Sequence, residues 1–374
     1  MIEEKDVRYS RSFEMGFSRR LQEIIDVSKG YFKSFAFKEK ADEAPIDFVV
    51  TWVDGEDPEW QIERNRCLNI IEKNKEDNHK GRYRAWDSFR YWFRAVEKYA
   101  PWVNNVFLVT WGHIPPWLNI NAPKLRIIKH TDFMPSKYLP TFNCNSIEIN
   151  LFRIKELQEQ FVYFNDDVFL ARPAKKEEFF LNGKPRHTAI ATPWINRNRE
   201  LPYYLFFNVY GEINKLNNMK ECIKKYPEKW FSHLYQRSRF ENLYPYRNGV
   251  LPGMFLSHVG IPFLKTTMSE TWEKYEKACD ETSAYKTRDI HQITHQLFSI
   301  EDIINGRFEP SVNDWGVNIG VEDSNTIDKV LTNRQTKMFC LFDGNYDDET
   351  VKQINRKLED VFEKHFPKKS SFEL

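Results

Sequence analysis

The chain lacks an excess of charge of either sign. Its 374 residues include 55 lysines and arginines against 54 aspartates and glutamates, a formal net charge of +1. No overall field would draw nucleic acid or an anionic membrane, so we expect no nucleic-acid partner. Only local patches of charge could attract such partners.

Cysteines are few and poorly spaced for structural chemistry. The five stand at positions 67, 144, 222, 279 and 340, and no two form a CxxC pair. An odd, scattered set argues against a disulfide framework or a zinc site and favours a reducing compartment.

Long apolar runs are also missing. The chain contains no stretch of about 18 apolar residues, and its first residues lack the pattern of a signal peptide. Together these absences predict a soluble, cytoplasmic protein.

Aromatic residues, in contrast, are abundant, with 30 Phe, 17 Tyr and 11 Trp. We expect most of them to fill the core and some to serve as platforms for sugars or bases.

The most informative stretch is FVYFNDDVFLARP, residues 161–173. Its aromatic and β-branched start predicts a buried strand, and Asp166 and Asp167 follow at the carboxyl end. In open α/β sheets ligands bind at that edge, and two adjacent carboxylates are costly to bury unless they are paired or bind a cation. A divalent cation that holds a nucleotide diphosphate would fit. The alternative is an ordinary Asn-Asp turn.

The same layout recurs earlier in the chain. Residues 46–53, 105–111 and 125–129 read as strands, and the apolar spacing from Phe89 to Val96 predicts a helix between the first two. This order predicts an α/β core with a mostly parallel sheet. Trp52 and Asp54, at the end of the first strand, could contact a ribose or base, or could be a core tryptophan and a turn aspartate.

A helix is expected to begin at Asn145 or Ser146 and to run through residue 157, with Ile147 and Leu151 on its inner face. Three polar residues lie at its start, where backbone N–H groups favour anions: Asn143, Asn145 and Glu148. This helix leads into the Asp166–Asp167 strand, so the topology places the polar cluster near the two carboxylates.

Four segments are predicted. Residues 1–44 form a helical, basic-aromatic extension, 45–173 the α/β core, 174–335 a mainly helical lobe, and 336–374 a strand and helix that return to complete the core sheet. In the extension, Phe17, Leu21, Ile24 and Ile25 keep helical spacing beside Arg19 and Arg20. That helix either packs on the main domain or contacts a membrane surface or a capsule-assembly partner.

Two features of the lobe carry chemistry. His258 lies before a Gly-Ile-Pro turn and, on its own, is more typical of a structural histidine. Residues 287–304 read as a helix that starts near Arg288, in which His291 and His295 are four residues apart. The Glu of an HExxH motif is absent, which argues against zinc hydrolase chemistry.

Four separated blocks together resemble the Stealth family, which includes bacterial capsular polysaccharide phosphotransferases and the catalytic subunit of the lysosomal-enzyme N-acetylglucosamine-1-phosphotransferase. The blocks span roughly residues 45–345 in the family's order: IDFVVTWVDGEDPEW; RYRAWDSFRYWFRAVEKYAPWVNNVFLVTWGHIPPWLN continuing through LPTFNCNSIE to FVYFNDDVFLARP; SHVGIPFLK with TSAYKTRDIHQ; and KMFCLFDG. The last block has Phe342 where a polar Asn is expected, which leaves Asp343 the least secure correspondence.

The resemblance implies a nucleotide-sugar-binding core of the GT-A or Rossmann type. It also implies transfer of a hexose-1-phosphate, such as N-acetylglucosamine-1-phosphate, from a UDP-hexose to a hydroxyl of an oligosaccharide or lipid-linked glycan. The product is a phosphodiester and the leaving group is UMP. A bacterial capsule or cell-surface polysaccharide pathway is implied, in the cytoplasm or at the inner face of the membrane.

The resemblance also assigns roles to residues. Asp166 and Asp167 would hold Mg²⁺ or Mn²⁺ on the diphosphate, Arg288 would stabilise the transferring phosphoryl group, and His258 would act as general base. Asp343 would orient His258 or join the metal ligands. The remaining positions would contact the nucleotide sugar: Trp52, Asp54, Asn143, Asn145 and Glu148.

Two other interpretations remain open. A metal-dependent glycosyltransferase would use the same carboxylates but move the sugar alone and release UDP. A non-catalytic glycan-binding protein would use the aromatic residues for stacking and would not need the two carboxylates.

Overall fold

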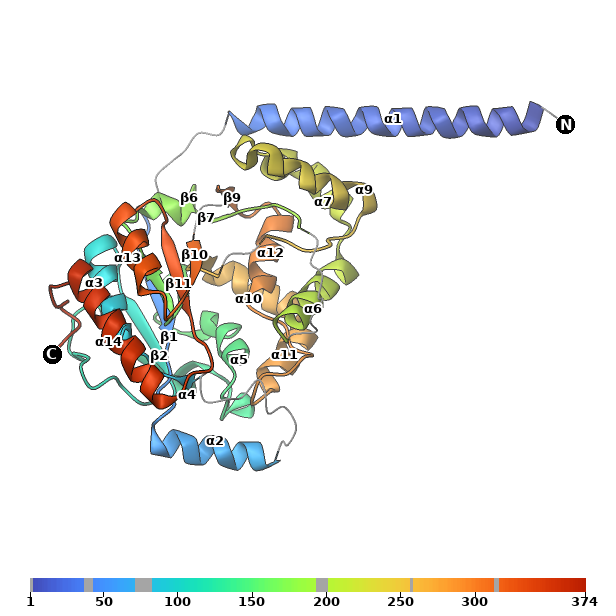
Figure 1. Ribbon diagram of the computed structural model, residues 1–374. Helices are drawn as coiled ribbons and strands as arrows, with labels where there is room; N and C mark the ends of the chain where they lie inside the picture. Colours follow the sequence, from blue (N-terminus) through green and yellow to red (C-terminus); the bar gives the residue numbers. More distant parts are fainter. Residues whose placement is uncertain (1–2, 37–42, 71–82, 193–200, 256–257, 313–315) are drawn as a thin grey trace.

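The computed structural model describes residues 3–36, 43–70, 83–192, 201–255, 258–312 and 316–374 (Figure 1). Across those ranges, every helix is too short or too polar to cross a membrane.

A five-stranded sheet with the order β3-β2-β1-β4-β8 forms the centre of the molecule. The first four strands run parallel, and the last pairs antiparallel with β4. Their bounds are β1 Ile46–Thr51, β2 Val106–Thr110, β3 Leu125–Lys129, β4 Gln160–Asn165 and β8 Ile261–Leu264. This Rossmann-type order confirms the predicted α/β class with a mostly parallel sheet.

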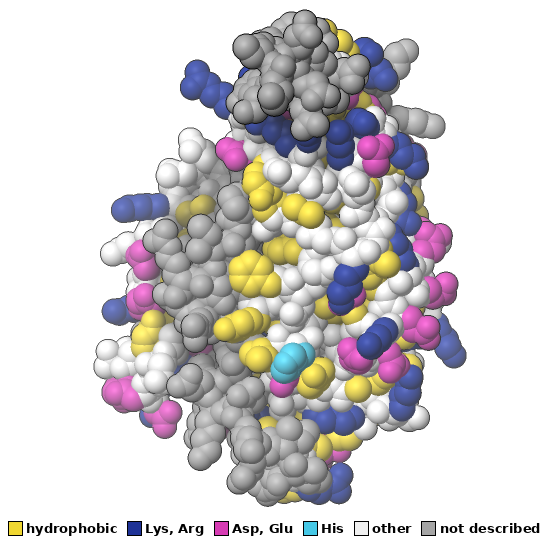
Figure 2. Space-filling model, turned by 90° about the vertical axis from the view of Figure 1, so that its right-hand side faces the viewer, with side chains coloured by type: hydrophobic (Ala, Val, Ile, Leu, Met, Phe, Trp, Pro, Cys, Tyr) yellow, Lys and Arg dark blue, Asp and Glu magenta, His cyan; other side chains and the backbone are white. Residues whose placement is uncertain are grey.

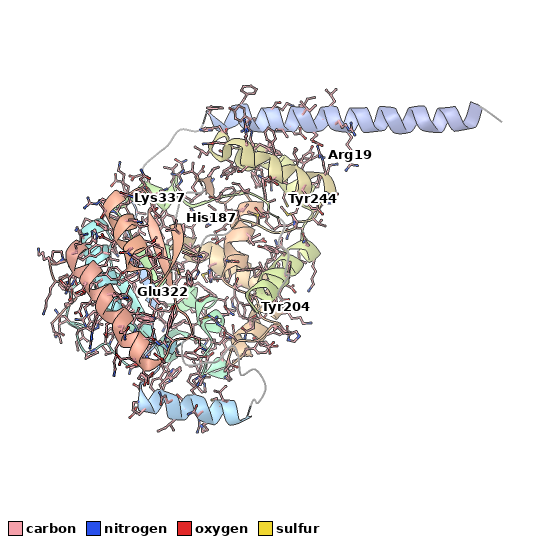
Figure 3. All side chains as sticks on the ribbon, in the orientation of Figure 1. Arg19, His187, Tyr204, Tyr244, Glu322 and Lys337 are labelled. Carbon is pink, nitrogen blue, oxygen red and sulfur yellow. The ribbon has the colours of Figure 1, made fainter. Side chains whose placement is uncertain are left out.

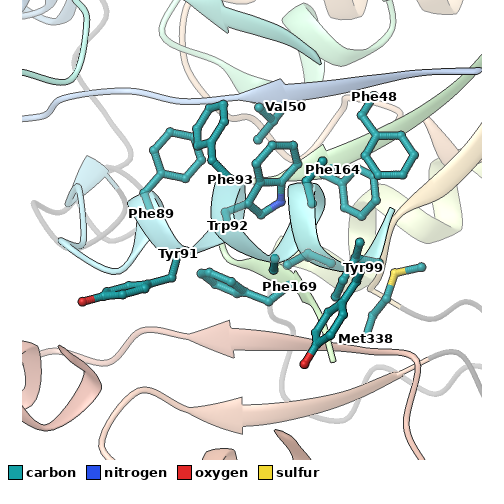
Figure 4. Close-up of a cluster of buried hydrophobic side chains, with 14 of the residues drawn as sticks. Phe48, Val50, Phe89, Tyr91, Trp92, Phe93, Tyr99, Phe164, Phe169 and Met338 are labelled. Atoms are coloured by element: carbon teal, nitrogen blue, oxygen red, sulfur yellow. The ribbon is translucent and has the colours of Figure 1, made fainter. Parts of the chain in front are cut away.

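The sheet is buried on both faces, which explains why its strands are continuous apolar runs rather than alternating ones. On β1, Phe48 and Val50 belong to one hydrophobic cluster and Val49 to the other. The first cluster packs under α3 (Phe89–Tyr99) and α14 (Asp348–His365), where the rings of Tyr91 and Phe362 stack. Figure 4 shows α3 inserting its aromatic side chains against this face.

The second cluster lies under the helical lobe. Its elements are α6 Leu201–Leu216, α7 Met219–Lys225, α8 Pro227–Trp230, the 3₁₀ segment η5 His233–Asn242, α9 Leu243–Asn248, α10 Lys265–Lys274, α11 Glu276–Ala284 and α12 Gln296–Ile304. A small sheet of β6 Phe180–Leu181, β7 Lys184–His187 and β9 Glu309–Pro310 adjoins it. Residues 201–304 are therefore mainly helical, and they also contribute β8 to the central sheet.

The C-terminal segment returns to the core, but it does not complete the central sheet as expected. β11 (Met338–Phe342) pairs antiparallel with β5 (Val168–Leu170) and parallel with β10 (Gly316–Gly320), in a separate three-stranded sheet. The short turn after β4 directs β5 out of the central sheet and towards β11. Helix α13 (Ser324–Asn333) connects β10 to β11.

Two predicted helices are shorter than expected. The helix expected over 145–157 is α5 (Cys144–Glu148), capped by Asn143, followed by the 3₁₀ turn η3 (Leu151–Arg153). The helix expected over 287–304 starts only at Gln296. Residues 287–295 are irregular, and Gln292 there donates to the Thr287 carbonyl and accepts from Asn145 of α5.

Helix α1 (Glu3–Ser34) extends well beyond the body (Figure 1), and its described contacts with the body come from its carboxyl half, from Arg19 to Ser34. Gly30 allows this contact, since a Cβ there would lie 2.4 Å from the Pro227 carbonyl oxygen. The remaining short elements are α2 Pro58–Ile70, α4 His130–Phe133, η2 Ser136–Tyr138 and η4 Lys176–Glu178.

Candidate active site

The turn between β4 and β5 carries Asp166 and Asp167 at the carboxyl edge of the central sheet. The Leu341 N–H donates to the Asp167 carbonyl at 2.8 Å, which fixes the turn against β11. The sequence thus placed the pair correctly at a strand end. The structure adds that this is where the chain passes from one sheet to the other.

His258 faces this turn from the segment before β8. Its Nε2 lies 3.7 Å from Asp167 Oδ1, and its side chain is 47% exposed. Enclosure by the protein lowers the pKa of His258, but the Asp167 and Glu148 carboxylates together raise it more, so the net shift is upward. Gly260 allows this approach, because a Cβ there would lie 2.4 Å from the Phe164 ring.

The protein's own groups contact the two carboxylates only loosely. Within the described part of the chain, His258 at 3.7 Å is the ion-pair partner of Asp167, and Asp167 Oδ1 has no hydrogen-bond partner. Burial and the neighbouring Asp167 charge raise the pKa of Asp166 to about 8. Both observations describe carboxylates whose charged form the protein stabilises poorly and a bound cation would stabilise.

The donor set fits a hard divalent cation. Ligand atoms of Asp167, His258 and Cys340 lie within 4.8 Å of one another. Burial raises the pKa of the Cys340 thiol, so it stays protonated and is a poor ligand. The carboxylates are the better ligands, and their oxygens suit Mg²⁺ or Mn²⁺.

Arg288 supplies the cation opposite these carboxylates. Its Nη2 donates to Cys144 Sγ at 2.9 Å, and the Cys144 sulfur and the Glu148 carboxylate both raise its pKa. The guanidinium therefore stays charged.

Two compartments meet at Asp166, Asp167 and Arg288. The first is largely aromatic and is lined by Trp52, Trp60, Tyr83 and Phe142, with Cys144, Ile147 and His130 among its other walls. Trp60 packs at 5.0 Å from Tyr83 and edge-on to Phe142. Such rings offer stacking faces to a base or sugar.

The second compartment lies between the carboxylates and the C-terminal sheet. It is lined by Arg84, Trp86, Ser88, Phe342 and Asp343. Arg84 Nη1 contacts both Asp343 oxygens, at 2.8 and 2.7 Å, and the Gly344 N–H donates to the same carboxylate. Asp343 thus reaches the site while paired to Arg84, and Phe342 beside it is exposed.

Trp52 and Asp54, the two residues predicted to contact substrate at the end of the first strand, have different surroundings. Trp52 lines the aromatic compartment and stacks on Phe89 at 5.9 Å, so it combines the predicted substrate position with a core role. Asp54 accepts the Glu56 N–H, which is the turn-capping alternative, and its contact with substrate stays a prediction.

Asn143, Asn145 and Glu148 are buried behind the wall that Phe142, Cys144 and Ile147 present to the aromatic compartment. Asn143 bonds Ser146 and caps the short helix, and Asn145 bonds Gln292. Their predicted substrate contacts find no direct support in this geometry and stay predictions.

Glu148 is the centre of a buried polar network. It accepts from Tyr163 at 2.9 Å and lies 2.6 Å from His295 Nδ1. Although burial opposes ionisation, His295 and Tyr163 lower the pKa of Glu148 to about 2. Because His295 is bound here and His291 pairs with Asp289, the two histidines do not share a ligand position.

Sequence reasoning missed Arg84, Trp60, Tyr83 and Cys340. Arg84 precedes the predicted 89–96 helix, and Cys340 lies in a strand assigned only to the core. Their side chains reach the site through contacts between distant segments, which spacing along the chain does not reveal.

Comparison with known proteins gives three matches to Stealth proteins: conserved region 1 over residues 44–72, conserved region 2 over 82–187 and conserved region 4 over 328–374. The capsular polysaccharide phosphotransferase WcwK of Streptococcus pneumoniae is 39% identical over 328 residues, covering 88% of this chain and 98% of that protein. The chain belongs to the Stealth family.

Other Stealth relatives are similarly close. The receptor polysaccharide phosphotransferase WefC of Streptococcus oralis is 33% identical, covering 88% of this chain and 99% of its own. The exopolysaccharide phosphotransferase cps2G of Lactiplantibacillus plantarum is 33% identical, covering 88% and 96%.

Among solved structures, the galactosyltransferase LgtC aligns with a TM-score of 0.36 at 11% identity, over 85% of this chain and 95% of that chain. The bifunctional glycosyltransferase WbbM also gives 0.36, over 88% and 53%. Likeness at this level is too distant to bear on function.

All of the polar site residues described above come from the matched Stealth regions or from the lobe between them. Asp166 and Asp167 lie in conserved region 2 and Asp343 in conserved region 4. His258 and Arg288 reach the same cleft from the lobe.

Proposed function

We propose that this Stealth protein transfers a hexose-1-phosphate from a UDP-sugar to a glycan hydroxyl and releases UMP, in the synthesis of a capsular or other cell-surface polysaccharide. The observation that carries the proposal is the meeting of two compartments at Asp166, Asp167 and Arg288. The names of the relatives, which are capsular, receptor and exopolysaccharide phosphotransferases, support the reaction class.

In this proposal the aromatic compartment holds the uridine, and the diphosphate lies over the carboxylates. Asp166 and Asp167 would bind Mg²⁺ or Mn²⁺, which neutralises the diphosphate charge when bound. Arg288 contacts the transferring phosphoryl group as its equatorial oxygens gain charge. Asp343 and Arg84 form the opposite wall.

His258 acts as the general base. The acceptor oxygen forms a bond to the sugar-bearing phosphorus, the bond from that phosphorus to the bridging oxygen breaks, and UMP leaves with the electron pair. The hydroxyl proton passes to His258 Nε2, which the Asp167 carboxylate stabilises in its charged form.

A metal-dependent glycosyltransferase is the second candidate, since the same carboxylates and aromatic compartment would serve it. The two reactions differ in the bond broken, so the nucleotide product separates them. Incubation with UDP-N-acetylglucosamine, UDP-glucose or UDP-galactose, Mg²⁺ and a capsule-type oligosaccharide should release UMP only when the acceptor is present.

Asp167→Asn and His258→Ala should each abolish UMP release, because one removes a metal ligand and the other the base. The matched controls are Asp132→Asn, at an exposed helix-capping aspartate, and His291→Ala, at an exposed histidine. UDP as the sole product would contradict the proposal and favour the glycosyltransferase.

The same proposal places the enzyme at the inner face of the membrane, through α1. Three large apolar side chains on one side of this helix are exposed: Leu21 by 48%, Ile24 by 61% and Phe32 by 71%. Phe35, just after the helix, is 58% exposed and stacks on His233 of the body. A helix that packed only on its own domain would not leave such a row in water.

The charges of α1 favour an anionic bilayer as the partner. Both acids in residues 18–36 face the body, where Glu23 pairs with Arg247 and Asp26 accepts from Tyr246 at 2.6 Å. Arg20 and Lys29 are exposed and flank the apolar row. Figure 2 shows Lys and Arg side chains gathered near the top of this face, where α1 lies. An apolar face with cationic margins is the pattern of an interfacial helix.

A further inference from the structure

The second compartment of the active site is larger than the aromatic one and has no assigned occupant. Its volume is about 340 Å³, against about 190 Å³. It meets the aromatic compartment at Asp166, Asp167 and Arg288, where the diphosphate lies in the proposed function. The donor's hexose is joined to that diphosphate, so its subsite has to border the same three residues.

An ion pair forms one wall of this compartment. Arg84 Nη1 lies 2.8 and 2.7 Å from the two carboxylate oxygens of Asp343. The two side chains are 18% and 21% exposed, so the pair is accessible from the cavity that it lines. The pair carries no net charge, and a carboxylate has about four lone-pair sites. A neutral ligand with hydroxyl groups therefore suits this wall better than a phosphate does.

The loop that carries Asp343 is held in place on both sides. Arg84 Nη2 donates to the Tyr346 carbonyl at 3.4 Å, and the Gly344 N–H donates to Asp343 Oδ1 at 2.7 Å. The Tyr346 hydroxyl donates to Glu322 at 2.6 Å, and Figure 3 labels Glu322 beside the C-terminal sheet. A carboxylate oriented before its ligand binds can select particular hydroxyl positions, because the ligand does not have to order it.

Phe342 gives the compartment an apolar face. It is the last residue of β11, whose other four residues are buried, yet Phe342 itself is 52% exposed. It lines the compartment next to Asp343. A sugar ring has an apolar C–H face and an edge of hydroxyls, so an exposed aromatic ring beside a polar pair matches it on both counts.

The acceptor glycan fits this compartment less well than the donor's hexose. As far as the chain is described, the lining comes mainly from the segment before α3, the turn after β4 and the end of β11, and His258 is not among the lining residues. A general base has to lie within hydrogen-bond reach of the hydroxyl that it deprotonates. An acceptor hydroxyl beside His258 would therefore approach from outside this compartment.

We propose that the second compartment binds the hexose of the UDP-sugar, with Arg84 and Asp343 bonding its hydroxyls and Phe342 packing against its apolar face. The inference rests on the proposed function, since it takes the uridine to lie in the aromatic compartment and the diphosphate at the carboxylates. It makes the Arg84–Asp343 pair the group that distinguishes one hexose from another.

The test compares the binding of UDP with that of UDP-N-acetylglucosamine, UDP-glucose and UDP-galactose by isothermal titration calorimetry, on the whole protein with Mg²⁺ and no acceptor. The double variant Arg84→Gln with Asp343→Asn removes one charge of each sign, so the net charge around the diphosphate is unchanged. It should bind the best UDP-hexose about tenfold more weakly, the effect of one or two lost hydrogen bonds, and bind UDP as the native protein does.

The matched control is Arg172→Gln with Glu178→Gln, at an ion pair of similar exposure, 24% and 19%, that lines neither compartment. This control should bind every ligand as the native protein does. Phe342→Ala changes an exposed side chain and should also weaken UDP-hexose binding but not UDP binding, so it provides the test even where the double variant does not fold.

The proposal is overturned if no UDP-hexose binds, or if the variants bind every UDP-hexose with native affinity. It is also overturned if they lose affinity for UDP as much as for the UDP-hexoses, which would assign these side chains to the nucleotide or the metal. The measurements need no turnover. Release of UDP rather than UMP in the product analysis would therefore contradict the reaction and leave the hexose subsite standing.

Discussion

At the residue scale, the site depends on the planar shape of the Arg288 guanidinium as well as on its charge. Arg288 borders both compartments and is held by Cys144 at 2.9 Å. Its planar guanidinium can contact two phosphoryl oxygens at once, which the ammonium of lysine cannot.

Arg288→Lys should therefore lower kcat about 100-fold and change the KM for the UDP-sugar much less, because the lost contact forms mainly as charge develops. Steady-state UMP release measures both constants. Arg126→Lys is the matched control, since Arg126 donates only to backbone carbonyls at the sheet edge. A rise in KM with unchanged kcat would show that Arg288 only binds the donor.

At the element scale, the outward face of α1 carries three large exposed apolar side chains: Leu21, Ile24 and Phe32. We expect the protein to sediment with vesicles that contain phosphatidylglycerol, and less in high salt because its cationic margins are screened. Ile24→Ser with Phe32→Ser should weaken this binding about tenfold or more, since two large apolar side chains no longer enter the interface.

Ile62→Ser on α2 is the control, because Ile62 is as exposed as Phe32 and lies on another helix. Equal loss in this control, or binding to pure phosphatidylcholine at the same level, would contradict a specific anionic surface for α1.

At the scale of the whole molecule, two buried histidines couple folding to pH. Burial lowers the pKa of both His130 and His187 to about 3. In the unfolded chain a histidine titrates near about 6.5. The unfolded chain therefore binds these protons more tightly, and the stability that each neutral histidine contributes above pH 6.5 is lost as the pH falls towards 3.

Between pH 7.5 and 5.5, each histidine should lower the free energy of unfolding by about 1.4 kcal/mol. Urea unfolding at the two pH values measures the change summed over all titrating groups, including Asp166 and Asp302, whose raised pKa values act in the opposite direction. The contribution of His130 is therefore the difference between the native protein and His130→Gln. His291→Gln, at an exposed histidine, should leave the pH dependence unchanged. A His130→Gln protein with the native pH dependence would show that His130 is not the group responsible.

Local chemistry was enough to find the strands and the Asp166–Asp167 turn, since buried parallel strands are continuous apolar runs and carboxylates at their ends stand out against them. The prediction of a helix that starts near Arg288 was wrong. Gln292 bonds Asn145 and the Thr287 carbonyl, and the helix begins only at Gln296.

Tertiary structure alone brought Arg84 onto Asp343 and Cys340 beside Asp167, and it placed His258 within 3.7 Å of a carboxylate 91 positions earlier in the chain. It also moved the C-terminal strand into a separate sheet with β5. Such contacts join segments with no shared periodicity. The apolar pattern along the chain indicates which side chains are buried, whereas the contact partner of each side chain is determined only when distant segments pack together.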